Sequence, residues 1–179
     1  MTTKQSRSDK SPYAWAALRI SLGAVFLWAF ADKLLGLGFA TCRDAGTNAV
    51  TTFCDKAWIG GGSPTSGFLE HATKGPFADF YQSLAGNGLV DVLFMAGLLL
   101  IGLALVSGAG VKIATAGGVV LMAMMWSAVL PPENNPVLDD HVVYALVLIG
   151  LNLSNGTQQW GLRGWWIKQS LVKRFSVLE

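Results

Sequence analysis

Four apolar stretches, each long enough to cross a lipid bilayer as a helix, constrain this chain more than any other feature of its sequence. They run from Tyr13 to Lys33, Gly88 to Ser107, Val111 to Leu130 and Val137 to about Asn155. The hydrocarbon core of a bilayer is about 30 Å thick and needs roughly 20 helical residues. Inside it, only helices and closed barrels pair every backbone hydrogen-bonding group. The sequence therefore predicts an all-α fold, a four-transmembrane-helix bundle.

The composition agrees with a protein embedded in lipid. Of the 179 residues, 52% are hydrophobic and 13% are charged, whereas ordinary soluble domains carry about 25% charged residues. The net charge is only +2, and the basic residues gather at the two ends of the chain, which is not the pattern of a nucleic-acid-binding surface. Because no repeat or long linker divides the sequence, we expect a single membrane domain over residues 1–179.

The distribution of lysine and arginine predicts the orientation of the spans. Basic residues precede the first span, occupy the turn between the second and third spans, and follow the fourth span: Lys4, Arg7, Lys10, Lys112, Arg163, Lys168, Lys173 and Arg174. In the loop of residues 34–87 acidic residues outnumber basic ones. Cytoplasmic flanks carry the excess of positive charge, so we expect a multi-pass plasma-membrane protein with both termini in the cytoplasm.

The tail after the fourth span mixes aromatic and basic residues at roughly helical spacing. Trp160, Trp165 and Trp166 stand among the basic residues of this tail. Such a segment lies in the membrane interface, with its aromatic rings at headgroup level and its charges toward anionic lipid. We therefore expect an interfacial C-terminal helix that contacts membrane lipid.

The loop of residues 34–87 is much longer than the usual connection between two helices, so we expect it to be structured and extracytoplasmic. It holds both cysteines of the chain, Cys42 and Cys54. Disulfides persist outside the cytoplasm, and the position of the pair predicts a structural disulfide. A redox-active pair is the alternative, although the spacing differs from the C-x-x-C of thiol oxidoreductases.

The sequence carries no motif for an electron carrier. It has no cysteine cluster for iron–sulfur, no haem-attachment motif and no glycine-rich dinucleotide fingerprint. Metal ligation is not indicated either. Electron transfer by this chain would therefore need a quinone as acceptor, a partner protein, or both.

Several short motifs give the chain a resemblance to a known family. They are Arg19 and Gly23 followed by Asp32-Lys33-Leu34, the loop segments GSPTSGFL at 62–69 and GPF at 75–77, and NPVLDDH at 135–141. Together they resemble the DoxX/DoxD family of four-span membrane proteins, its actinobacterial members especially.

The resemblance implies a four-helix membrane bundle. For the DoxD branch it implies the membrane subunit of a thiosulfate:quinone oxidoreductase that works with a small partner subunit. For the mycobacterial DoxX branch it implies a membrane-associated oxidoreductase complex that handles thiol and superoxide stress. Other relatives have no established redox chemistry, so the family does not fix the activity.

Ionisable residues of the four spans fall at one level, near the outer ends of the helices. Our hypothesis is a pocket in which Lys33 offers positive charge to an anionic substrate or a quinone oxygen, Asp91 or Asp140 holds that lysine, and His141 relays protons. The alternative is a fringe of interfacial charges. Arg19 and Lys112 lie nearer the cytoplasmic face, where we expect their side chains to reach the headgroups.

A quinone site also needs an apolar slot, and Trp126 and Tyr144 are the candidates for its aromatic wall. The leading hypothesis is a membrane subunit of a quinone-linked oxidoreductase. Two alternatives stay open: a non-catalytic scaffold that docks an extracytoplasmic redox partner through the long loop, and a bundle that binds lipid or a small solute. Co-purification of a quinone would discriminate between them.

Overall fold

The computed structural model describes residues 11–44, 46–154 and 159–178. The basic residues Lys4, Arg7 and Lys10 of the predicted cytoplasmic flank lie outside this part. Within it the fold is all-helical, and the only β-type pairing is an isolated antiparallel bridge between Arg43 and Val50. The all-α prediction is therefore confirmed.

Within the described residues, three helices are long and apolar enough to cross a membrane: α1 (Ser11–Leu35), α4 (Gly88–Ser107) and α5 (Val111–Ala128). The side chain of Asn87 starts α4 by accepting hydrogen bonds from two backbone N–H groups of its first turn. Gly108 ends it in the left-handed conformation, with φ of 72°. Helix α5 ends two residues before Leu130, since the residue preceding a proline disfavours helix.

The fourth apolar stretch forms a shorter helix than the expected span of 137–155. Helix α6 covers Asp140–Leu153, 14 residues, which rise about 21 Å. It begins late because the Asn135 side chain binds the N–H groups of Val137 and Leu138 in a turn, and Asp139 then caps the helix. By length alone, α6 falls short of a bilayer core.

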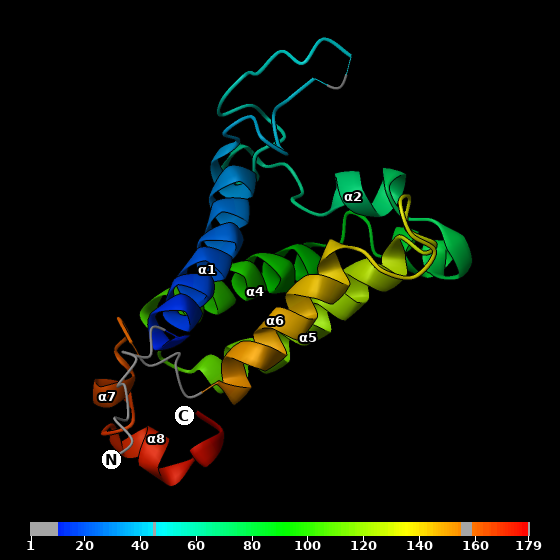
Figure 1. Cartoon of the computed structure of the whole chain (residues 1–179). Coiled ribbons are helices and arrows are strands. Elements are labelled where there is room, and N and C mark those ends of the chain that lie inside the picture. The colour runs from blue at the N-terminus through cyan, green and yellow to red at the C-terminus, as the bar shows by residue number, and fades with distance from the viewer. Residues whose placement is uncertain (1–10, 45, 155–158, 179) are drawn as a thin grey trace, which may run out of the picture.

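The long helices pack as two pairs, α1 against α4 and α5 against α6 (Figure 1). Glycines allow the close approach: a Cβ added at Gly23 would lie 2.9 Å from the backbone nitrogen of Val106, and one at Gly118 would lie 2.7 Å from Leu148. Contact between the pairs, through α4 and α5, is less extensive. The main core lies among the four helices and includes Phe26, Met95, Leu105, Met122 and Leu148.

The segment between α1 and α4 contains four short helices. They are η1 (Trp58–Gly60), α2 (Ser66–His71), η2 (Gly75–Phe77) and α3 (Ala78–Gln82). The first part of the segment projects beyond the C-terminal end of α1 (Figure 1). The predicted disulfide between Cys42 and Cys54 is present in this projecting part.

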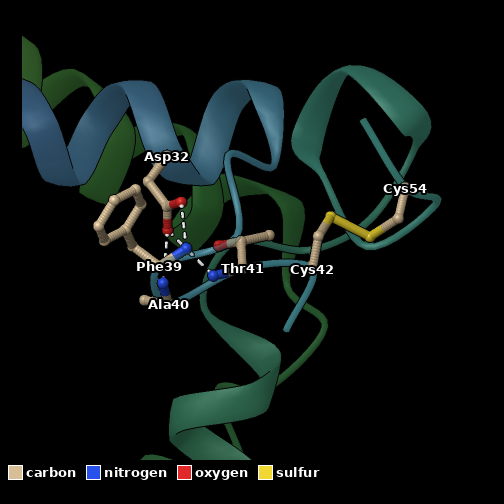
Figure 2. Close-up of a disulfide and its surroundings, with 6 residues drawn as sticks. All are labelled: Asp32, Phe39, Ala40, Thr41, Cys42 and Cys54. Atoms are coloured by element: carbon tan, nitrogen blue, oxygen red, sulfur yellow. Dashed lines mark hydrogen bonds between the residues drawn. A yellow bond between two sulfur atoms is a disulfide. The ribbon is translucent and has the colours of Figure 1, made fainter. Parts of the chain in front are cut away.

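Asp32, buried in the last turns of α1, fixes the start of the projecting segment. Its carboxylate accepts hydrogen bonds from the backbone N–H groups of Phe39, Ala40 and Thr41 at 2.9 to 3.1 Å (Figure 2). Cys42 follows directly, so the carboxylate and the disulfide hold adjacent parts of one loop. A buried carboxylate with three such donors has its charge compensated without a basic partner.

The C-terminal part of the chain lies at the other end of the bundle, near the start of α1 (Figure 1). Its described residues, 159–178, form the short helices α7 (Arg163–Trp166), α8 (Ser170–Arg174) and η4 (Ser176–Leu178) rather than one continuous helix. The backbone N–H of Leu162 donates to the carbonyl of Ser107 at 2.7 Å, which attaches this segment to the end of α4.

Arg19 does not reach toward the headgroups as expected, because its side chain points into the protein and is fully buried. One terminal nitrogen donates to the carbonyls of Leu105 and Val106 at the C-terminal end of α4. The other donates to the carbonyls of Gln159 and Trp160, at 3.1 and 3.4 Å. The negative end of the α4 dipole favours a cation there, so Arg19 joins α1, α4 and the C-terminal segment.

Candidate functional site

An apolar groove of about 730 Å³ runs between α4 and α5. Its lining extends along α4 from Val90 to Ala104, about 21 Å at 1.5 Å per residue, and along the facing side of α5. Gly97 and Gly117 open the groove: a Cβ added at Gly97 would meet no neighbouring atom within 4 Å, and one at Gly117 would meet only Ile101, at 3.9 Å. The groove is long enough and apolar enough to hold a hydrocarbon tail.

Among the described residues that line this groove, Lys33 is the one basic residue. The side chain is half-buried, and its Nζ lies 5.9 Å from the centre of the Phe94 ring, within the range of a cation–π contact. Across the described residues, no carboxylate forms an ion pair with it. A cation therefore borders an apolar groove, and its side chain forms no salt bridge within the described residues.

Aromatic side chains surround the same end of the groove. Phe68 from α2, Tyr81 from α3 and Phe94 from α4 all line it. The Tyr81 hydroxyl lies 2.6 Å from that of Ser127, which donates in turn to the carbonyl of Met124. Flat apolar faces next to a cation suit a planar ring that carries hydrogen-bond acceptors.

Asp91 is buried close to this end, but it binds hydroxyl groups. One carboxylate oxygen accepts hydrogen bonds from Ser63 at 2.8 Å and from Thr65 at 2.5 Å. Ser63 also accepts the N–H of Ser66 at the start of α2. Asp91 thus fixes the loop that forms part of the groove lining, and no ion pair joins it to Lys33 in the described structure.

The remaining ionisable residues of the predicted pocket belong to the start of α6. The Nδ1 atom of His141 lies 2.7 Å from a carboxylate oxygen of Asp139, the residue that caps α6. Asp140 is exposed. Neither Asp140 nor His141 lines the groove, so the structure does not bring the four predicted residues into one pocket.

Trp126 and Tyr144 also lie outside the groove lining. The indole N–H of Trp126 donates to the carbonyl of Val137 at 2.7 Å, which holds the chain ahead of α6. Tyr144 is half-buried and packs against the main core. Both side chains therefore have structural contacts that account for their positions.

In the described part of the chain, no three His, Cys, Asp or Glu side chains come together as a metal site would require. Comparisons with protein-family models, with curated proteins and with solved structures give no match. The groove and its residues are therefore the basis for assigning a function.

Sequence reasoning identified Lys33 but missed the groove residues Phe68, Tyr81, Phe94 and Gly97. One signal was available for Phe94, which follows Asp91 by three positions and so shares a helix face with it. Gly97 had no such signal, because its sequence surroundings resemble those of Gly102. Gly102 is nevertheless packed against Leu27, where an added Cβ would lie 2.7 Å from Cγ.

Proposed function

We propose that this protein binds a quinone in the groove between α4 and α5 and serves as the membrane subunit of a quinone-linked oxidoreductase. The observation that carries the proposal is the position of Lys33, a cation without a salt bridge in the described structure, at the aromatic end of a tail-length apolar groove. A quinone head has carbonyl oxygens that accept hydrogen bonds from an ammonium group, and its isoprenoid tail is apolar. The motif resemblance to the DoxX/DoxD family supports the same activity.

The flat aromatic surfaces favour a quinone over a phospholipid as the occupant. Phe68, Tyr81 and Phe94 line the groove, and aromatic rings pack favourably against a planar head, whereas a phosphate needs several donors and water. Lys33 supplies only one charged group. A phospholipid in the groove is the alternative outcome of the experiment below.

We propose that α6 completes a four-span bundle with both termini in the cytoplasm, with the projecting segment outside. Three of the spans rest on length and composition, and the orientation rests on the basic flanks. Glu70 and Lys168 are exposed, so single cysteines at these positions test the topology. In intact cells an impermeant maleimide should label only the Glu70→Cys variant. Labelling of Lys168→Cys instead would show that the orientation is the opposite of the proposed one.

Reduction of a quinone takes up two electrons and two protons and yields the hydroquinone. The sequence has no electron carrier of its own, so a partner protein or a soluble reductant supplies the electrons. With thiosulfate, two molecules give tetrathionate and the two electrons that the quinone takes up. We assign to the partner subunit the surface of exposed Phe53, inside the loop closed by the disulfide, and exposed Ile59 in η1, which follows it.

The first test is the quinone content of protein purified in mild detergent. The wild type should retain a quinone in near-stoichiometric amount, measured by solvent extraction and mass spectrometry. Lys33→Gln should retain about tenfold less, since a charge-assisted hydrogen bond contributes about 1.5–3 kcal/mol. Lys33→Arg should recover part of the loss.

Lys56→Gln is the matched control, because Lys56 is an exposed lysine of the segment between α1 and α4 and lies outside the groove lining. It should retain as much quinone as the wild type. Two results together would contradict the oxidoreductase proposal: the extracts contain phospholipid but no quinone, and thiosulfate does not reduce an added quinone in membranes. The protein would then be a lipid-binding bundle or a scaffold.

A further inference from the structure

The end of the groove opposite Lys33 is formed by a residue far away in the sequence. Trp166, from α7, lines the groove beside Ala109 and Gly110 of the α4–α5 turn. A Cβ added at Gly110 would lie 4.0 Å from Cζ2 of Trp166. The benzene edge of the indole therefore stands at the turn where the groove ends.

The indole of Trp166 is held in this position by the C-terminal segment. Its Nε1 donates to the carbonyl of Leu178 at 2.6 Å, and η4, which contains Leu178, contacts α5. Since the indole N–H is paired with that carbonyl, the remaining atoms of the ring that reach the groove are apolar. The bonds of Leu162 to Ser107 and of Arg19 to Gln159 and Trp160 fix the preceding part of the same segment.

We propose that Trp166 terminates the groove and so determines how long a hydrocarbon tail the protein accommodates. This inference rests on the proposed quinone binding and adds the residue that selects for tail length. From Val90 to Ala104 the groove follows α4 for about 21 Å. A tail that fits this length buries each of its carbons against α4 and α5, and a longer tail meets the indole and leaves sideways into lipid.

The test uses the full-length protein in lipid nanodiscs and a series of quinones with one head group and one to ten isoprene units. In the wild type, affinity should rise with each added unit, because burial of a methylene stabilises the complex, and should then stop rising once the tail reaches Trp166. In Trp166→Ala the affinity should continue to rise for longer tails. The affinity for the head with a single unit should be unchanged.

Trp165→Ala is the matched control, since Trp165 precedes Trp166 in α7 but is 59% exposed and does not line the groove. It should keep the wild-type dependence on tail length. Trp166→Leu is the second variant in case the alanine protein does not fold. It keeps an apolar side chain of smaller size, and it should shift the plateau in the same direction by a smaller amount.

Two results would overturn the inference, and they differ. If the series binds but the plateau falls at the same tail length in the wild type and in both Trp166 variants, Trp166 does not end the groove, while quinone binding stands. If no member of the series binds any of the proteins, the proposed function fails, and the role of Trp166 fails with it.

Discussion

Replacing Arg19 by methionine should lower the free energy of unfolding by about 3 kcal/mol, because a buried acceptor left without a donor costs about 1–3 kcal/mol and Arg19 binds several. The guanidinium of Arg19 binds carbonyls of two separate parts of the chain, and an apolar side chain leaves those carbonyls without a donor. For a protein of this size the loss corresponds to a fall in melting temperature of roughly 10 °C. Thermal unfolding in detergent, followed by circular dichroism, measures it.

Arg19→Lys separates charge from geometry. Lysine keeps the cation, but its single nitrogen lacks the planar fork that lets arginine bind α4 and the C-terminal segment together. We expect Arg19→Lys to have a melting temperature between those of the wild type and Arg19→Met. Lys168→Met is the control, because Lys168 is exposed and its replacement should change stability by less than about 0.5 kcal/mol. An unchanged melting temperature for Arg19→Met would show that these carbonyls find other partners.

Replacing Gly97 by leucine should remove bound quinone while leaving the fold intact. The new side chain would enter the groove, since a Cβ at this position meets no neighbouring atom within 4 Å. Leucine also has a higher helix propensity than glycine, by up to about 1 kcal/mol, so the helix itself should not weaken. We expect quinone retention at least about tenfold lower, measured by extraction from the purified protein.

Two variants control for the change of residue type. Gly97→Ala adds only a methyl group and should retain most of the quinone. Gly88→Leu makes the same change at the start of α4, where an added Cβ also meets nothing within 4 Å and the residue does not line the groove. If Gly97→Leu binds quinone as well as Gly88→Leu does, the occupant does not lie between α4 and α5.

The helices follow from the hydropathy pattern, whereas the partners of the charged residues do not. Apolar stretches with turn residues at their ends predicted α1, α4 and α5 to within two residues at each end. Our hypothesis from the sequence has either Asp91 or Asp140 as the partner of Lys33. In the structure, Asp91 accepts hydrogen bonds from the hydroxyl groups of Ser63 and Thr65, which lie 28 and 26 positions earlier in the chain. A local sequence pattern does not predict such a contact.

The groove between α4 and α5 could not be predicted from the sequence either, for a different physical reason. It exists because the pairs α1–α4 and α5–α6 pack tightly while α4 and α5 meet less extensively. Glycines occur both at the tight contacts and in the groove, and the sequence alone does not show which is which. The position of a cavity depends on how helices pack, and a hydropathy pattern reports only that each helix is apolar.

Helix α1 carries a buried anchor near each of its ends. Arg19 donates a hydrogen bond to the backbone of the C-terminal segment. Asp32, about 20 Å further along the helix axis, accepts hydrogen bonds from the backbone at the start of the projecting segment. A helix is stiff over this distance, so a rotation of α1 about its axis cannot be confined to one end. Helix α1 therefore holds the projecting segment and the C-terminal segment, which contains Trp166, in a fixed relation to each other.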